Sequence, residues 1–170
     1  MTQKIIILPT VQHTGSRLVD SIFRSKRDFK TTYAHVNLKN IDTFVELAKE
    51  HATIVPLRHP LRVAQSFESR GKLLDDFFSE WNLIISMIAP LDPMYIHVDL
   101  TGKRDSDLTA IGDKFDINVG TIWPYVGKWP WCSEHPPGIK PLDEIRLINN
   151  NSVMDFIDRN SDFFGAHYEC

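Results

Sequence analysis

Apolar and polar positions follow one another along the chain in blocks that predict strands and helices in turn. The apolar run 5–8 has the length of a strand, and its β-branched residues suit a central strand of a parallel sheet covered on both faces. The apolar positions 18, 19, 22 and 23 then recur at helical spacing. The same order repeats further along: strands are predicted at 31–36, 52–57 and 94–98, and helices at 41–48, from Pro60, at 73–88 and from about Ser106. This alternation predicts an α/β fold with a mostly parallel sheet between two layers of helices.

Proline, glycine and capping residues refine these boundaries. Pro60 suits the first position of a helix, where its missing N–H group has no cost, and Gly71 is placed to end that helix. Asn40 or Asp42 begins the helix over 41–48, and Ser152 with Asp155 predicts a capping box for a helix over 152–157. Residues 142–148 are also predicted to be helical, whereas 118–141 is rich in loop residues and is expected to act as a lid.

Composition sets the size and the surroundings of this fold. With 170 residues, of which 42% are hydrophobic, the chain is expected to form a single domain over 1–170. The net charge of −3 and the lack of a basic run predict no nucleic-acid partner. Two cysteines form neither a disulfide framework nor a zinc spacing, and no apolar run approaches the roughly 20 residues that a membrane span needs. We therefore expect a cytoplasmic protein without a membrane partner. The seven histidines lack metal-binding spacing, so no metal is expected.

A short polar loop lies between the first predicted strand and helix. Thr14, Gly15 and Ser16 stand where a strand ends and a helix begins, and free N–H groups with the helix dipole attract phosphate or sulfate at such places. The alternative is an ordinary turn capped by Thr14 or Ser16.

A second candidate segment follows the third predicted strand. Arg58 lies just past the end of that strand, and Ser66 follows eight positions later on the next helix. A guanidinium group and a hydroxyl group on the same phosphate would make a charge-assisted binding site. The alternatives are that Arg58 caps helix carbonyls or pairs with an acid, and that Ser66 is a small packing residue.

Three segments together resemble the PAPS-dependent sulfotransferases, where PAPS is 3′-phosphoadenosine 5′-phosphosulfate. Arg58, Pro60 and Ser66 resemble the segment with which that family binds the 3′-phosphate. Residues 13–17 resemble its 5′-phosphosulfate loop, which commonly reads Lys-x-Gly-Thr-Thr; here the lysine is missing. Residues 33–35 lie where cytosolic members carry Lys-Thr-His, whose histidine is the catalytic base.

This resemblance implies a P-loop-NTPase-like sulfotransferase topology and a function. PAPS would donate a sulfuryl group to a hydroxyl or amine acceptor by in-line displacement, leaving the 3′,5′-bisphosphate PAP, and no metal would be needed. The backbone around Thr14, Gly15, Ser16 and Arg17 would hold the phosphosulfate, with His13 or Arg17 as the cationic donor in place of the lysine.

The remaining roles also follow from the resemblance. Arg58 and Ser66 would bind the 3′-phosphate, and Lys128 lies in a segment similar to a late loop that closes over the nucleotide. His35 would take the acceptor proton. The alternative for His35 is a strand histidine satisfied by a backbone partner.

Two rival functions and the acceptor stay open. A P-loop kinase of nucleotides or nucleosides would normally need G-x-x-x-x-G-K-[ST], but no glycine precedes Gly15 in this loop. A non-catalytic module that binds PAPS or PAP would have lost turnover with the lysine. Aromatic side chains either form an apolar acceptor wall or belong to the core: Phe77, Phe78, Trp81, Trp123, Tyr125, Trp129 and Trp131.

Overall fold

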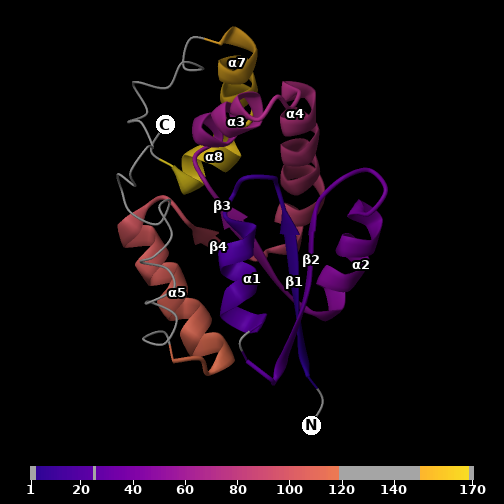
Figure 1. Ribbon diagram of the computed structural model, residues 1–170, viewed down its shortest axis with the longest axis vertical. Coiled ribbons are helices and arrows are strands. Elements are labelled where there is room, and N and C mark those ends of the chain that lie inside the picture. Colours follow the sequence, from indigo (N-terminus) through magenta and orange to yellow (C-terminus); the bar gives the residue numbers. More distant parts are fainter. Residues whose placement is uncertain (1–2, 25, 119–149, 169–170) are drawn as a thin grey trace.

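Parallel strands form the centre of the molecule in the computed structural model, which describes residues 3–24, 26–118 and 150–168. Within these residues four strands form one sheet in the order β2-β1-β3-β4 (Figure 1). The strands are β1 (Lys4–Thr10), β2 (Phe29–His35), β3 (Ala52–Leu57) and β4 (Met94–His97), and every pairing is parallel. The predicted helix over 142–148, the expected lid over 118–141 and Lys128 lie outside the described residues, apart from residue 118 itself.

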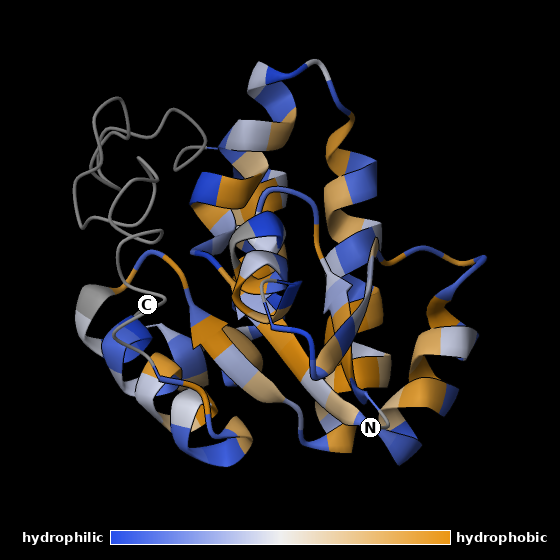
Figure 2. Cartoon of the chain, turned by 60° about the horizontal axis from the view of Figure 1, so that its bottom comes forward, coloured by the Kyte–Doolittle hydropathy of each residue, from blue (hydrophilic) through white to orange (hydrophobic). Residues whose placement is uncertain are grey.

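Helices cover both faces of this sheet, as the two separate core clusters show. On one face, α1 (Ser16–Arg24) and α5 (Thr101–Phe115) pack against apolar residues of β1, β3 and β4. The other face carries α2 (Ile41–Glu50), α3 (Pro60–Ser69), α4 (Leu74–Leu83), α7 (Asn151–Arg159) and α8 (Ser161–His167). Apolar residues, drawn in orange, follow the strands in the middle of the molecule (Figure 2). The predicted α/β fold with three layers is therefore confirmed.

The strand order fixes where a ligand site is expected. The chain leaves β1 through α1 on one face and leaves β3 through α3 on the other. Such a switch between adjacent strands opens a crevice at their carboxyl ends, and ligands of open α/β sheets bind there. The order 2-1-3-4 is the one found in flavodoxin-like doubly wound sheets. The finer P-loop-like topology stays a prediction.

Several predicted boundaries were wrong. The start of α5 was predicted too late, since the helix begins at Thr101 rather than near Ser106. Its first turn is polar, so no apolar pattern indicated this turn in the sequence. The continuous helix over 73–88 is instead α4 followed by a π-helical turn (Ile84–Ile88) and a 3₁₀ turn (Ala89–Leu91). α7 is capped by Asn150, whose side chain accepts a hydrogen bond from the N–H group of Val153, and not by the predicted Ser152 box.

The end of α3 agrees with the prediction from Gly71. Gly71 adopts a φ of 67°, the left-handed conformation that glycine reaches without strain. Its N–H group donates to the carbonyl of Glu68, and the N–H group of Lys72 donates to that of Phe67. These two bonds form a Schellman motif, which fixes the direction in which the chain leaves the helix. Among the described helices, none is long and apolar enough to cross a membrane.

Candidate functional site

The loop between β1 and α1 is folded tightly against the end of β4. The hydroxyl of buried Thr14 donates to the carbonyl of Val11 at 2.7 Å. Gly15 adopts a φ of 84°, and a Cβ added there would lie 3.1 Å from Cγ1 of Val98, so any other residue at this position would be strained. Ser16 Oγ lies 3.1 Å from the hydroxyl of Tyr33 on β2. Both hydroxyls thus have partners outside the first turn of α1 in the described part of the chain. The first N–H groups of a helix have no partner within the helix and can donate to a ligand.

His35 lies beside this loop, at the end of the neighbouring strand. Its Nδ1 is 3.0 Å from Oγ1 of Thr10, and the same hydroxyl donates to the carbonyl of Ala34 at 3.1 Å. A hydroxyl has one hydrogen, so when that hydrogen goes to Ala34 the Nδ1 of His35 must be the donor to Thr10. The lone pair of the ring is then on Nε2. The ring of His35 therefore contacts the side chain of Thr10 on the adjacent strand, and not the backbone partner of the alternative interpretation.

The ionisation of His35 suits a base. Burial lowers its pKa below the ordinary 6.5, and the charges of Lys72 and Arg17 lower it further. The imidazole is therefore neutral at neutral pH, as a proton acceptor must be.

His13 does not fit the role of a cationic donor in the free protein. Its ring packs edge-on against Phe67 at 5.1 Å, and burial lowers its pKa to about 4, with further lowering by Arg70, Lys72, His35 and Arg58. At neutral pH the side chain therefore carries no charge. Of the two residues expected to replace the missing lysine, only Arg17, exposed in the first turn of α1, is cationic.

Arg58 reaches the loop from the other side. Its guanidinium donates to the carbonyl of His13 at 3.4 Å, and burial lowers its pKa while buried Asp99 opposes that shift. Asp99 also accepts from the N–H group of His59 at 2.9 Å and lies 3.8 Å from Nε of Arg62. Two arginines thus share one carboxylate, which leaves a positive charge in excess.

Ser66 is not joined to Arg58 in the part of the chain that the structure describes. It is half-buried on α3, and its backbone carbonyl accepts from the hydroxyl of Ser69 at 3.2 Å. The expected pair of guanidinium and hydroxyl therefore has no direct contact between its members.

Residues that the sequence did not indicate complete the surroundings of the loop. The backbone N–H and the Nε2 of Gln12 each donate to the carboxylate of Glu80 at 2.6 Å, and Nζ of Lys72 donates to Oε1 of Gln12. These partners are 68 and 60 positions apart in the chain, so no local spacing reveals them. One signal was present for Glu80: it stands between Phe77 and Trp81 on the buried side of α4.

Several cationic side chains lie around the loop. Lys72, Arg70, Arg58 and Arg17 are close enough to lower the pKa of His13 or of His35. Cations gathered around one loop in a chain of net charge −3 are well suited to attract a phosphate or sulfate ester.

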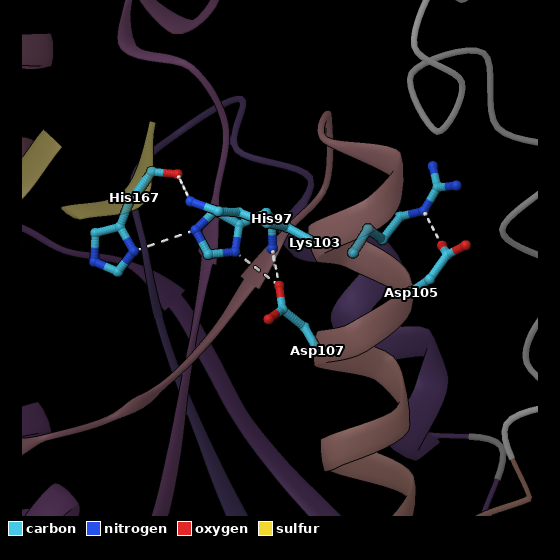
Figure 3. A network of polar contacts seen from close by, with 6 residues as sticks. His97, Lys103, Asp105, Asp107 and His167 are labelled. Carbon is cyan, nitrogen blue, oxygen red and sulfur yellow. Dashed lines mark hydrogen bonds and ion pairs between the residues drawn. The ribbon is translucent and has the colours of Figure 1, made fainter. Parts of the chain in front are cut away.

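A second polar cluster lies at the far edge of the sheet, beyond β3. Nδ1 of His97 is 2.7 Å from Asp107 on α5, and its Nε2 is 3.2 Å from Nδ1 of His167 (Figure 3). Lys103 donates to the carbonyl of His167 at 2.5 Å. Since the ring of His167 packs on Tyr95 with centroids 4.3 Å apart, we interpret the cluster as the attachment of α8. Within the described ranges, no group of three or more acidic, histidine or cysteine side chains is placed to hold a metal ion.

A scan against protein-family models found no match, and searches of curated proteins and of solved structures found none either. The site is therefore interpreted from its own chemistry.

Proposed function

We propose that the protein is a PAPS-dependent sulfotransferase that binds its donor across the carboxyl ends of β2, β1 and β3. One observation carries the proposal: the loop after β1 is flanked by a neutral histidine, His35, on one side and by a half-buried arginine, Arg58, on the other. A sulfuryl transfer needs a proton acceptor and a cationic cradle for the donor phosphates, and these two residues supply both.

In the proposed reaction the bond between sulfur and the 5′-phosphate oxygen breaks, and its electron pair stays on the phosphate of PAP. The acceptor oxygen or nitrogen forms the new bond to sulfur, and its proton passes to Nε2 of His35. N–H groups at the start of α1 and the surrounding cations hold the donor and stabilise the charge that develops on the leaving phosphate. Phe77 and Trp81 are fully buried in the core and Phe78 packs against it, so these three side chains form no acceptor wall, and no acceptor class is proposed. No metal takes part in the proposed reaction.

The test begins with binding. Calorimetry should show PAP binding well ahead of AMP, which lacks the 3′-phosphate, and Arg58→Gln should lose about 2 kcal/mol of PAP binding, as expected for a charged hydrogen-bonded contact. Arg159→Gln is the control, because Arg159 is exposed on α7. Thermal unfolding of both variants shows whether Arg58→Gln is still folded. Equal affinity of the wild type for PAP and AMP would refute the assignment.

Turnover separates the rival functions. Mass spectrometry of acceptor mixtures incubated with PAPS should detect a product with an added sulfuryl group, and transfer should persist in excess EDTA. Phosphoryl transfer from ATP that is lost in EDTA and restored by magnesium would favour the kinase. PAP binding without any transfer would favour the non-catalytic module.

A further inference from the structure

The turn after α3 brings a lysine to the loop that lacks one. Lys72 follows Gly71 in the Schellman motif, and its own N–H group is tied to the carbonyl of Phe67 at 3.0 Å. Its Nζ donates to the side-chain oxygen of Gln12 and lies 5.9 Å from the centre of the Phe67 ring. Both the backbone and the ammonium group of this residue are therefore held in place.

A buried carboxyl group orients the partner of Lys72. Both oxygens of Glu80, which is 6% exposed, accept hydrogen bonds from Gln12. Because the amide nitrogen of Gln12 is used by Glu80, its oxygen is turned to the other side, where Lys72 donates to it. A line of polar contacts thus runs from α4 through the loop to Lys72.

The ammonium group of Lys72 can take a further acceptor. Its charge lowers the pKa of Glu80, but the hydrogen bond that it makes with the loop is to the neutral amide of Gln12. An ammonium has three donors, so a ligand oxygen can be added without loss of Gln12. By comparison, Arg58 shares Asp99 with Arg62, and His13 is neutral. Lys72 also acts on both histidines beside the loop, since its charge lowers the pKa of His13 and of His35.

We propose that Lys72 is the cation that binds the phosphate or sulfate oxygens of the donor at the loop, and that Gln12 and Glu80 position it there. The residue thereby takes the place of the absent loop lysine from a different element of the fold. The identity of the ligand as PAPS rests on the proposed function. The binding of a phosphate or sulfate group by Lys72 does not.

The experiment compares Lys72→Gln, Lys72→Arg and Lys49→Gln by calorimetry with two probes, PAP and inorganic sulfate. Lys49 is an exposed lysine of α2 that pairs with Glu46. Lys72→Gln should weaken PAP binding on the order of tenfold to a hundredfold, the range for a hydrogen bond to a charged group, whereas the other two variants should stay within a few-fold of the wild type. Histidine titration by NMR gives a second readout: Lys72→Gln should raise the pKa of His35, because a nearby positive charge is removed.

The outcomes separate the two proposals. A wild type that binds sulfate but not PAP refutes the sulfotransferase, and Lys72 is then judged by whether Lys72→Gln weakens sulfate binding. If the wild type and Lys72→Gln bind PAP equally well, the proposed role of Lys72 is refuted and the sulfotransferase proposal is not. A wild type that binds neither probe refutes both.

Discussion

His35 shows how a neighbouring side chain can set the chemistry of a single residue. The hydroxyl of Thr10 donates to a backbone carbonyl and thereby leaves its oxygen to accept from Nδ1 of His35. A base at this position needs the opposite nitrogen, Nε2, to be free of hydrogen. The bond of Thr10 to Ala34 favours this tautomer of His35 before any ligand is bound.

Replacing Thr10 tests that relation. Thr10→Val keeps the shape of the side chain but removes the hydroxyl, so His35 should lose its preference for one tautomer, and the free energy of unfolding should fall by about 1 kcal/mol. Long-range proton–nitrogen NMR spectra report which ring nitrogen carries the hydrogen. Thr10→Ser, which keeps the hydroxyl, should retain the wild-type spectrum. A wild-type His35 protonated on Nε2 would contradict the assignment.

Gly15 is a second position where the addition of one carbon atom is expected to change the stability of the protein. Gly15→Ala would place a methyl group 3.1 Å from Val98 in a backbone conformation that disfavours any side chain, so we expect a loss of about 1–3 kcal/mol in unfolding free energy. Gly102→Ala is the matched control, because its added methyl would meet nothing within 4 Å on α5 and should be neutral or stabilising. Urea unfolding measures both. Equal stability of Gly15→Ala and the wild type would show that the loop can move away from β4.

Among the helices and strands, the sequence predicted those whose positions depend on a local pattern of apolar and turn residues. The third strand was predicted at 52–57, where the structure has it, and Pro60 begins α3, because alternation of apolar runs and turn residues is a local signal. α8 was missed, since its apolar residues Phe163 and Phe164 are too few to form a period. In the site, the loop and Arg58 could be predicted from local sequence signals. The contacts of Thr10 and Lys72 could not, because they join elements that are far apart in the chain.

The cluster in Figure 3 is expected to hold α8 on the sheet. Asp107→Ala removes the acceptor of both the ring and the backbone N–H group of His97, so it should lower the unfolding free energy by about 1–3 kcal/mol and speed hydrogen exchange in α8. Asp113→Ala is the control on the same helix, since that side chain is exposed and should change stability by less than about 0.5 kcal/mol. Equal exchange rates in α8 for both variants would assign the attachment to the aromatic contacts alone.

For the whole molecule, burial of histidines links stability to pH. His13, His59 and His167 each have a pKa lowered to about 4, chiefly by burial, against 6.5 for the ordinary group. Between these values the unfolded chain binds more protons than the folded one, so the free energy of unfolding rises with pH and falls on acidification. The contribution of these histidines is complete above pH 6.5 and is lost as the pH falls toward 4. Glu80 and Asp99 act in the opposite direction, because burial raises their pKa values.

The contribution of one histidine can be isolated at the start of α3. His59 caps this helix with Nδ1, which accepts from the N–H group of Leu61 at 3.3 Å, and a proton on that nitrogen would remove the cap. His59→Asn keeps an acceptor at the cap but does not titrate, so its stability near pH 7 should stay within about 1 kcal/mol of the wild type. Urea unfolding from pH 7 to pH 5 should then show a slope smaller by up to about 1.4 kcal/mol per pH unit, the effect of one proton. An unchanged slope in His59→Asn would show that His59 ionises as freely in the folded protein as in the unfolded chain, and would contradict its burial as a neutral cap.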